Sequence, residues 1–332
     1  MNYEELSTKR AELDRHRGED GGLSSVLVRS LEDWFRIELT YSSNAIEGNT
    51  LTRRETALVV EKGLAVGGKS LVEHLEATNH AAALDWVTEI AGRRGGVVSE
   101  REILTIHGMI LHGIDDANAG RYRDVAVRIS GSQVVLPNPV KVPELMAEFA
   151  AWLAKPNTTH PVELAAEAHY RLVTIHPIAD GNGRMARLLM NLILLMHGYP
   201  PALIPIRSRL KYIGALEQAQ LGGAKDEYLK LIGRAAGRSL DINLKAIGGD
   251  ARAEPIEPEE GLLKIGQLAE KAGETVATIR FWTKQGLLHV AETTPANYAL
   301  YAPEAVDRTR RIQALKERRY TIKEIGRMLD AQ

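Results

Sequence analysis

Residues 176–187 read HPIADGNGRMAR and place several reactive side chains close together. His176 can accept a proton near neutral pH. Asp180 offers the oxygen ligands that suit Mg²⁺. Arg184 and Arg187 stand three residues apart, so on a helix they share one face and can bind the same anion. This set fits phosphoryl or nucleotidyl transfer, in which positioning and charge neutralisation provide the catalysis.

The glycines of the motif stand where a helix is expected to begin. The residues before the motif predict a helix from Pro161, and the apolar run after it predicts a second helix, buried on nearly all sides. At that helix's N-terminus, backbone N–H groups and the helix dipole attract anions. Gly181, Asn182 and Gly183 would let phosphate oxygens approach closely. Taken singly, such residues are usually structural, but the combination at this spacing favours a catalytic site.

Composition predicts a cytoplasmic protein of two domains. The 332 residues are 44% hydrophobic and 26% charged, enough for more than one core. Cysteine is absent, which excludes disulfides and thiolate metal sites. Residues 1–20 are charged and contain no apolar targeting segment, and the longest apolar stretch, 188–196, is too short to span a bilayer. No membrane association is expected.

The chain is expected to divide at residues 248–261, which are rich in Gly, Pro and Glu and have no apolar periodicity. We interpret them as a linker that precedes a C-terminal domain at 262–332. That domain holds 12 Lys and Arg against 8 Asp and Glu, whereas the rest of the chain holds 30 against 35. Basic charge is therefore concentrated at the C-terminus. We interpret 1–95 as an N-terminal helical region and 96–247 as the core that carries the motif.

Helical periodicity dominates before the linker. Apolar residues recur at helix spacing over 25–46, 54–65, 71–91, 99–113, 141–154, 162–175, 183–197 and 209–233. Thr52 and Glu55 predict a capping box. Residues 121–137 instead alternate around a Ser-Gly-Ser turn and predict a β-hairpin. Its apolar positions are Val125, Val127, Ile129, Val134 and Leu136. The predicted fold class is mainly α, a helical bundle with one β-hairpin, followed by a small second domain.

HPIADGNGRMAR resembles the signature of the Fic family, HxFx(D/E)GNGRxxR, with Ile178 in the place of phenylalanine. The resemblance implies an enzyme that moves AMP from ATP onto a Ser, Thr or Tyr hydroxyl of a protein. It implies that His176 is the general base and that Asp180 binds Mg²⁺, the implied cofactor. The intact GNGR sequence favours adenylylation over phosphorylation.

The same resemblance assigns the phosphates of ATP to the turn and the helix that follows. It implies that Gly181, Asn182 and Gly183 cradle the α- and β-phosphates. Arg184 and Arg187 would clamp the β- and γ-phosphates.

Two other segments acquire roles from the resemblance. In the Fic family a hairpin called the flap pairs with an extended segment of the target, by strand addition to an open edge. Residues 123–137 stand in the expected place upstream of the motif. An ordinary surface hairpin is the alternative. Tyr212 falls in a predicted helix that resembles the adenosine-side wall of the family.

Residues 43–48 read SNAIEG and match the inhibitory pattern (S/T)xxxE(G/N) of the Fic family. They close a stretch with helical periodicity, and Gly48 fits a residue just beyond the helix end. The resemblance implies that Glu47, in a pattern opened by Ser43, pairs with Arg187 and blocks the γ-phosphate. A carboxylate and a phosphate compete for the same guanidinium fork. The sequence therefore predicts a self-inhibited enzyme, in which Glu47 could also orient a water for removal of AMP.

After the linker, LKIGQLAEKAG and ETVATIRFWTKQGLL predict two short helices joined by a turn. The residues expected to face inward are Leu268, Ala269, Ala272, Val276, Ile279 and Phe281. Those expected to project toward DNA from the second helix are Thr275, Thr278, Arg280 and Lys284. The segment 262–332 resembles the winged helix-turn-helix of the MerR family, which implies DNA binding.

Two departures from the MerR pattern bear on that expectation. Ala299 stands where the wing arginine of the family contacts phosphate, which predicts weaker binding without a change in sequence preference. The chain also stops before the family's long dimerisation helix, so a homodimer is expected to form through the Fic region. A protein-docking module is the alternative to DNA binding. For the whole chain, the alternative is a transcription regulator whose Fic region senses nucleotide without turnover.

Overall fold

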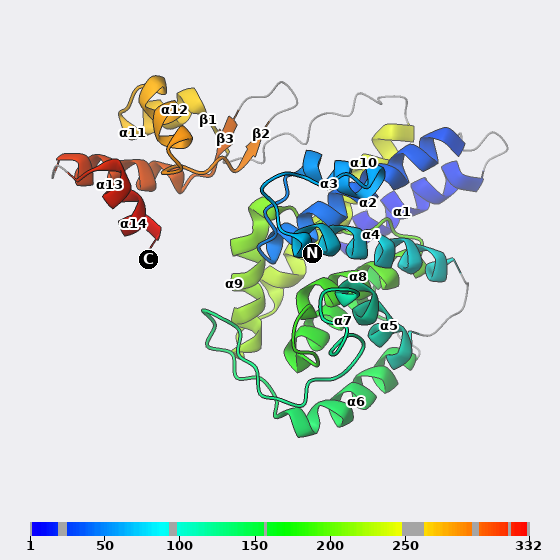
Figure 1. Cartoon of the computed structure of the whole chain (residues 1–332). Coiled ribbons are helices and arrows are strands. Elements are labelled where there is room, and N and C mark those ends of the chain that lie inside the picture. Colours follow the sequence, from blue (N-terminus) through cyan, green and yellow to red (C-terminus); the bar gives the residue numbers. More distant parts are fainter. Residues whose placement is uncertain are drawn as a thin grey trace. The chain divides into compact units, whose positions relative to one another are not determined.

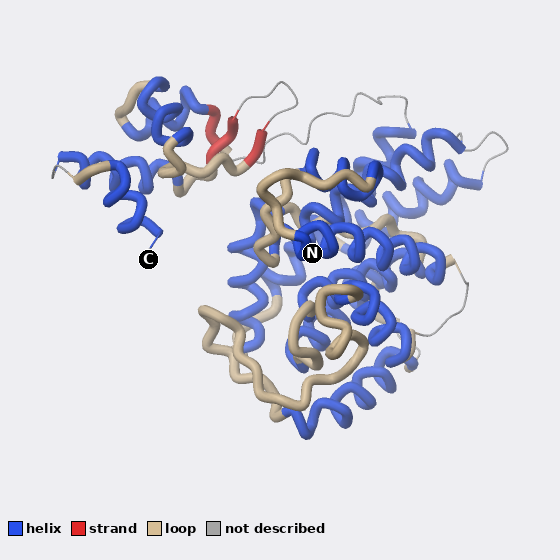
Figure 2. Tube along the Cα trace, viewed as in Figure 1, coloured by secondary structure: helices blue, strands red, loops and turns tan. Residues whose placement is uncertain are grey.

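The computed structural model describes residues 2–18, 25–92, 98–155, 158–247, 262–293, 299–317 and 320–330. The chain forms two compact units, Met1–Asp250 and Ala251–Gln332. Residues 248–261, interpreted above as a linker, lie outside the described residues. The described chain is mainly helical, which confirms the predicted fold class, and its strands belong to the smaller unit (Figures 1 and 2).

The larger unit is built from helices. They are α1 (Tyr3–Gly18), α2 (Ser25–Ile46), α3 (Arg53–Lys62), α4 (Leu71–Ala91), α5 (Glu100–Leu111), α6 (Val142–Ala154), α7 (Pro161–Ile175), α8 (Asn182–Met196), α9 (Arg209–Gln220) and α10 (Asp226–Ile247). Two short 3₁₀ turns, η1 (Pro139–Lys141) and η2 (Ile206–Ser208), precede α6 and α9. One buried core extends from α1 to α10, across the predicted boundary at residue 95.

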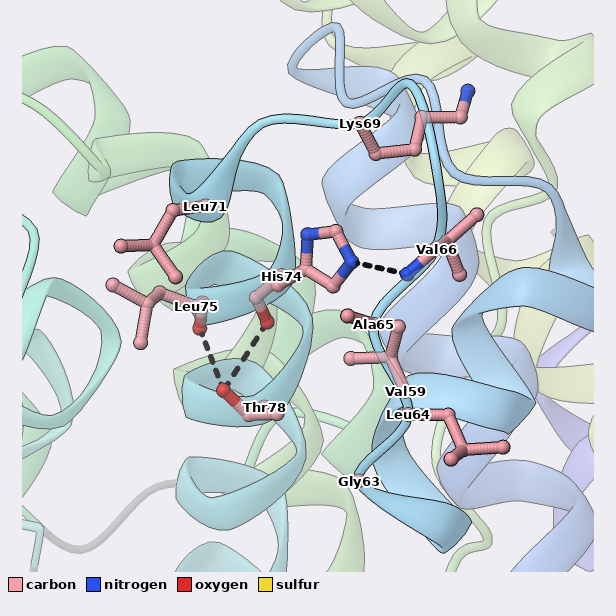
Figure 3. A pocket seen from close by; sticks show the side chains of 10 residues that line it. All are labelled: Val59, Gly63, Leu64, Ala65, Val66, Lys69, Leu71, His74, Leu75 and Thr78. Carbon is pink, nitrogen blue, oxygen red and sulfur yellow. Dashed lines mark hydrogen bonds between the residues drawn. The ribbon is translucent and has the colours of Figure 1, made fainter.

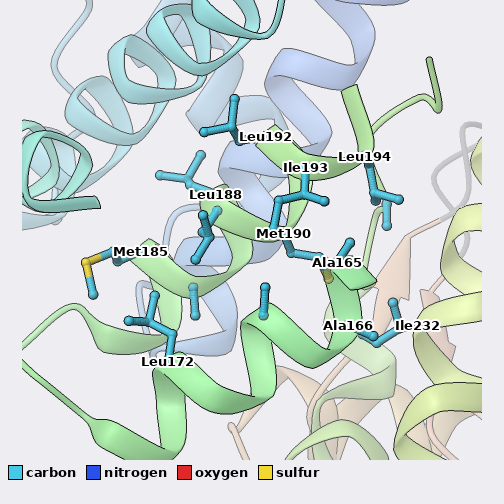
Figure 4. Close-up of a cluster of buried hydrophobic side chains, with 14 of the residues drawn as sticks. Ala165, Ala166, Leu172, Met185, Leu188, Met190, Leu192, Ile193, Leu194 and Ile232 are labelled. Carbon is cyan, nitrogen blue, oxygen red and sulfur yellow. The ribbon is translucent and has the colours of Figure 1, made fainter. Parts of the chain in front are cut away.

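Helix α8 is the central element of this unit. Every residue from Arg184 to Leu194 is buried, as the apolar run predicted. Helices α4, α5 and α7 pack against it (Figure 1). In Figure 4 its Met185 and Leu188 lie near Leu172 of α7. Removing apolar surface from water stabilises the folded state by about 25 cal/mol for each Å² buried. The N-terminus of α8, which carries the motif, is therefore held by packing on several sides.

Local sequence signals set several helix ends. Helix α7 begins at Pro161, as predicted. Thr52 and Glu55 form the predicted capping box, in which each side chain bonds the other's backbone N–H. Helix α1 lies in the predicted N-terminal helical region, but its own residues were not among the stretches with apolar periodicity. The stretch predicted as helical over 209–233 is also divided, since α9 and α10 are separated by a turn at 221–225.

The predicted β-hairpin was wrong as a pair of strands: the described segment between α5 and α6 contains no strand and is drawn as a long tan loop in Figure 2. It reverses direction near Gly131, which has a φ of 76°. Four of the predicted apolar positions, Val127, Ile129, Val134 and Leu136, are half-buried, whereas the fifth, Val125, is 57% exposed. The two legs do not pair as a β ladder within the described structure. Arg123 lies between them and donates to a carbonyl of each, at Val125 and Pro137.

A hollow of about 370 Å³ lies at α3, α4 and the loop between them (Figure 3). Its lining is mostly apolar, and His74 crosses it to accept a hydrogen bond from the backbone N–H of Val66 at 2.8 Å. It contains no residue of the 176–187 motif. No helix within the described ranges combines the length and hydrophobicity needed to cross a membrane.

The smaller unit joins short helices to a small antiparallel sheet. The strands β1 (Leu263–Lys264), β2 (Glu292–Thr293) and β3 (Ala299–Tyr301) are ordered β1-β3-β2. The helices are α11 (Ile265–Ala272), α12 (Val276–Lys284), α13 (Ala305–Glu317) and α14 (Ile322–Asp330). Helices α11 and α12 confirm the predicted pair. The inward placement of Phe281 was wrong: Phe281 is 49% exposed, and Trp282, one position on, fills the core together with Ile279.

Candidate active site

His176 is the last residue of the turn that ends α7. Its backbone is left-handed, with a φ of 51° and a ψ of 58°. Among the described residues, it is the only one other than glycine that has a positive φ. Nδ1 lies 3.3 Å from the carbonyl oxygen of Val173. Because a carbonyl only accepts, Nδ1 carries the proton and Nε2 is left as the basic nitrogen. Burial lowers the pKa of His176, so the imidazole is neutral near pH 7.

The turn that follows leads directly into α8. Gly181, at the N-cap position, has a φ of 85° and provides no side-chain cap, so the first N–H groups of the helix remain available to an anion. The side chain of Asn182 is committed elsewhere: it donates to the carbonyl of Ile178 at 2.8 Å and accepts from its N–H at 3.2 Å. Asn182 thereby closes the turn, and only its backbone N–H is left for the predicted phosphate cradle.

Asp180 and Arg184 meet at one side of this turn. Arg184 donates from NH2 to Oδ2 of Asp180 at 3.0 Å and from NH1 to Oε1 of Glu76 at 2.7 Å. Glu76, on α4, also accepts from Asn49 at 2.9 Å. The sequence reasoning did not single out Glu76, because a glutamate within an amphipathic helix carries no local signal. The predicted phosphate-clamp residue Arg184 is buried and already paired with two carboxylates.

The residues at this site fit a magnesium ion. The Asp180 side chain is 72% exposed, so its carboxylate is open to the site despite the bond from Arg184. Within the described ranges, no group of three or more His, Asp or Glu side chains is placed to hold a metal. Mg²⁺ is commonly held by one or two carboxylates, with phosphates and water as the other ligands. A single aspartate beside a nucleotide site meets that requirement.

Glu47 and Arg187 form an ion pair across the entrance of α8. The NH2 group of Arg187 donates to Oε1 of Glu47 at 2.7 Å. Arg187 is also bound by Ser43, whose hydroxyl accepts from Nε at 3.0 Å and whose carbonyl accepts from NH2 at 2.9 Å. A methyl group added at Gly183 would collide with Oε1 of Glu47. The carboxylate of Glu47 therefore lies directly over the second residue of α8, where an anion would bind.

Electrostatics holds this pair in its ionised form. Burial raises the pKa of Glu47, but the positive charges of Arg187, Arg184 and Arg209 outweigh it and lower the pKa overall. Arg209, at the start of α9, also donates to the carbonyl of Ile46 at 2.6 Å. This places a cation at the C-terminus of α2, where the helix dipole favours it. Gly48, with a φ of 103°, ends the helix as predicted.

Tyr212, which was predicted to form the adenosine-side wall, is buried in the core. Its side chain is 1% exposed, on α9, and its hydroxyl is 2.7 Å from Nε2 of His169. Burial raises the pKa of Tyr212, and the nearby charge of Arg187 partly opposes this rise. The ring is thus packed behind the site and presents no exposed face to a nucleotide.

Two further residues hold the turn 176–183, and no pattern in the sequence indicated either of them. His107, on α5, is fully buried, accepts from the N–H of Gly120 at 3.0 Å, and donates from Nε2 to the carbonyl of Asp180 at 3.1 Å. Burial lowers its pKa to about 4, so it is neutral. Arg123 donates from Nε to the carbonyl of His176 at 2.7 Å, and its N–H donates to Pro177. Arg123 thus joins the segment 123–137 to the turn 176–183.

Replacing Arg123 with alanine is expected to lower the free energy of unfolding by about 2–4 kcal/mol, because buried carbonyls lose a charged donor. Urea denaturation measures this loss. Arg121→Ala, at an exposed neighbouring position, is the matched control and should change stability by less than about 0.5 kcal/mol. Equal losses from the two variants would contradict this role for Arg123.

The smaller unit presents its second helix with a partly basic face. Arg280, Phe281 and Lys284 are exposed on α12 and follow one helical face. Thr275 caps this helix: its hydroxyl accepts from the N–H of Thr278 at 3.1 Å and lies 2.9 Å from the hydroxyl of Thr278. The four predicted DNA-facing residues therefore lie at one end and one side of α12, and the two threonines are engaged in the cap.

Residues 97–194 match the Fic/DOC family, and residues 263–332 match the MerR HTH family of regulatory proteins. A protein adenylyltransferase Fic from Nematostella vectensis is 40% identical over 61% of this chain and 48% of the relative. One from Aedes aegypti is 35% identical over 77% of this chain and 52% of the relative. The chain spans about half the length of the curated relatives it matches.

Solved structures agree with these matches. Fic-1 from C. elegans (amino acids 134–508) is 30% identical with a TM-score of 0.64, over 74% of this chain and 73% of that chain. A Fic domain containing signaling protein from Bacteroides thetaiotaomicron is 29% identical with a TM-score of 0.66, over 75% of this chain and 98% of that chain. The fold and the motif define a Fic protein, and the chain belongs to the Fic/DOC family. Its smaller unit adds a match to the MerR HTH family.

Proposed function

We propose that this protein transfers AMP from ATP to a hydroxyl side chain of a protein, with Mg²⁺ bound at Asp180. One juxtaposition carries the proposal: a neutral imidazole with a basic Nε2 precedes an uncapped, buried helix N-terminus that is flanked by Arg187. The relatives named protein adenylyltransferase support the same activity. A base beside an anion site is what nucleotidyl transfer to a hydroxyl needs.

The chemical step is a displacement at the α-phosphorus. The target hydroxyl oxygen forms a bond to that phosphorus, while the bond to the bridging oxygen of the β-phosphate breaks and pyrophosphate leaves. The hydroxyl proton passes to Nε2 of His176. The N–H groups at the start of α8 stabilise the phosphate charge, and Arg187 binds the terminal phosphates. Mg²⁺ supplies further charge neutralisation when it is bound.

Glu47 is proposed to inhibit this reaction. In the described state its carboxylate engages Arg187 and lies over Gly183, which is the space that the terminal phosphates need. Two anions cannot share one guanidinium fork, so productive binding of ATP requires Glu47 to move away. The same carboxylate, once displaced, could orient a water toward an AMP-modified target and so support removal of AMP.

The segment 123–137 is proposed to bind the target. Its legs form no strands within the described structure, which leaves backbone groups open to an added strand. Its tip is fixed to α9, because Glu217 accepts from the hydroxyl of Ser132 at 2.6 Å and from the N–H of Gln133 at 3.0 Å. Its base is fixed to the catalytic turn by Arg123. A target strand bound there would lie beside His176.

Mass spectrometry tests the proposal most directly. Lysate proteins are incubated with the Glu47→Gly variant, ATP and Mg²⁺, and searched for a covalent AMP adduct on hydroxyl side chains. The adduct is expected with this variant and not when His176→Ala is added to it. Nucleotide binding without any adduct would support the alternative, a regulator that senses nucleotide without turnover. Cytoplasmic location and homodimer formation stay predictions from the sequence.

The smaller unit is proposed to bind DNA through α12. The match to the MerR HTH family and the exposed Arg280 and Lys284 support this. Basic side chains on a helix that enters a groove supply phosphate and base contacts.

Replacing both Arg280 and Lys284 with alanine is expected to lower the affinity for genomic DNA fragments about tenfold. The affinity should also depend less steeply on salt concentration, by a slope that corresponds to about one to two phosphate contacts, because each contact releases counterions. Electrophoretic mobility shifts at several salt concentrations measure both effects. Lys230→Ala, on α10 of the larger unit, is the control and should bind like the native chain. Absence of any salt-sensitive shift by the native chain would favour a protein-docking module.

A further inference from the structure

The peptide between Asp180 and Gly181 stands where the turn 176–183 enters α8. Its carbonyl oxygen, that of Asp180, accepts a hydrogen bond from Nε2 of His107 on α5 at 3.1 Å. The peptide is trans, so its C=O and N–H groups point in opposite directions. The N–H of Gly181 therefore points away from α5. Among the described residues it has no hydrogen-bond acceptor, so it is available to a bound anion.

The backbone fixes which nitrogen of His107 carries the proton. The side chain has no exposed surface, and its Nδ1 accepts from the N–H of Gly120 at 3.0 Å. Because a backbone N–H only donates, Nδ1 has no proton and Nε2 carries one. Nε2 must therefore donate, and the carbonyl of Asp180 is the acceptor that it contacts. One imidazole thus joins the loop after α5 to the start of α8.

Glycines allow α5 to approach this turn closely. Gly181 has a φ of 85°, and a β-carbon there would lie 3.0 Å from Cδ1 of Ile110 and 3.7 Å from Cδ2 of His107. A β-carbon at Gly120 would lie 3.3 Å from the carbonyl oxygen of Leu104. The peptide between residues 180 and 181 is therefore packed directly against α5, where only the glycine backbone fits.

Asp180 directs its two polar groups to different surroundings. Its side chain is 72% exposed at the site, whereas its carbonyl is bound to the buried His107. If His107 could not donate, this carbonyl would have to turn toward another donor, because a buried carbonyl without a partner is costly. Since the peptide is planar, that rotation would carry the N–H of Gly181 away from the site.

We propose that His107 is a positioning residue that holds the peptide between Asp180 and Gly181 so that the Gly181 N–H donates to a phosphate oxygen of the bound nucleotide. This inference rests on the proposed function. An N–H group that is already oriented at a helix N-terminus binds an anion without reorganising. His107 lies behind the peptide and acts only through the carbonyl of Asp180.

Calorimetric titration with ATP and Mg²⁺ tests this role in the full chain that carries Glu47→Gly. Adding His107→Asn keeps an acceptor for the N–H of Gly120, but the shorter side chain does not reach the carbonyl of Asp180. It is expected to weaken ATP binding about tenfold, because one hydrogen bond to a charged phosphate is lost. His107→Gln can still donate to that carbonyl and should bind ATP within about threefold of the parent.

His160→Asn is the matched control. Nδ1 of His160 also accepts from a backbone N–H, that of Val162 at 3.2 Å, but His160 stands at the far end of α7 from His176. This variant should bind ATP like the parent. Undiminished binding by His107→Asn would overturn the proposal. Equal losses in His107→Asn and His107→Gln would also overturn it, since restoring the donor would then have no effect.

The amide signal of Gly181 in nuclear magnetic resonance provides a second test that needs no His107 variant. The sequence contains two Asp-Gly pairs, at 20–21 and 180–181, so ¹³C-carbonyl aspartate combined with ¹⁵N-glycine selects two amides. Asp20→Glu removes the first of them. ATP with Mg²⁺ should shift the Gly181 amide proton of the parent downfield, as donation to an anion does. His107→Asn should lose this shift. An unmoved Gly181 signal in the ATP-bound parent would overturn the proposal even if no variant folds.

The two levels of inference fail differently. If the parent binds ATP with the Gly181 shift, and His107→Asn loses affinity, but no AMP adduct forms, the proposed transfer is wrong and the role of His107 stands. If adducts form while the Gly181 signal does not move, the transfer stands and the role of His107 is wrong. A parent that binds no ATP would overturn both.

Discussion

Replacing Glu47 with glycine is expected to raise AMP incorporation from ATP by about tenfold to a hundredfold. The carboxylate makes a charge-assisted hydrogen bond to Arg187 at 2.7 Å, and such bonds contribute about 1.5–3 kcal/mol. Removing it frees both the guanidinium and the space over Gly183. Since the change lies outside α2, which ends at Ile46, the helix itself is retained.

The measurement is transfer of labelled AMP to protein at fixed ATP and Mg²⁺. Glu47→Gln keeps the side chain's size but removes its charge, so it should give an intermediate increase. Glu61→Gln, at an exposed position on α3, should match the native protein. If Glu47→Gly were no more active than the native chain, Glu47 would not be an inhibitor of this reaction.

Replacing His176 with alanine in the Glu47→Gly background is expected to lower the rate constant for transfer by about 10²- to 10⁴-fold. That is the usual contribution of a positioned general base. The proton of the attacking hydroxyl would have no acceptor other than water. Binding of ATP should be nearly unchanged, because the imidazole faces the target and not the phosphates in the proposed step.

The rate constant and the ATP affinity are measured separately by single-turnover transfer and by titration. His112→Ala is the control, since the side chain of His112 is 81% exposed on the surface. The pH profile of the parent adds a second test. Because the pKa of His176 is lowered from 6.5, the rate should rise with pH below that pKa and be level by pH 7. A rate still rising steeply above pH 7 would assign the base to another group.

Local sequence signals predicted the parts of the site that lie close together in the chain. The turn from His176 to Gly183 is one short stretch between two amphipathic helices, so its position at a helix N-terminus followed from the pattern of apolar residues alone. The pairing of Glu47 with Arg187 came from a resemblance, because 140 residues separate the two in sequence. The structure brings them together where α2 meets α8.

The remaining site residues could not be found in this way. His107, Arg123 and Glu76 act through contacts with distant backbone or side chains, and single residues of these types occur on many helices and loops. Tyr212 was predicted to form the adenosine-side wall because the sequence indicated a helix there but not which side of that helix faces the site. Tyr212 lies on the side of α9 that packs into the core, so its ring is buried.

Differences in the fold also have local causes. Helix α1 has few apolar residues and is stabilised by packing on α10, which its own composition does not show. The break between α9 and α10 occurs at Gly222, which has a φ of 90°, and such a glycine ends a helix even where the apolar spacing continues. In α12 the neighbouring Phe281 and Trp282 are both large and apolar, so spacing alone did not decide which fills the core.

The left-handed backbone at His176 has a consequence for how this protein balances folding against activity. A residue with a β-carbon is strained there by about 1 kcal/mol, whereas glycine adopts the same dihedral angles freely. The folded state is therefore less stable with histidine at this position than it would be with glycine, but the histidine provides an imidazole next to the N-terminus of α8. An inert protein with glycine at this position would tolerate heat better than the working one.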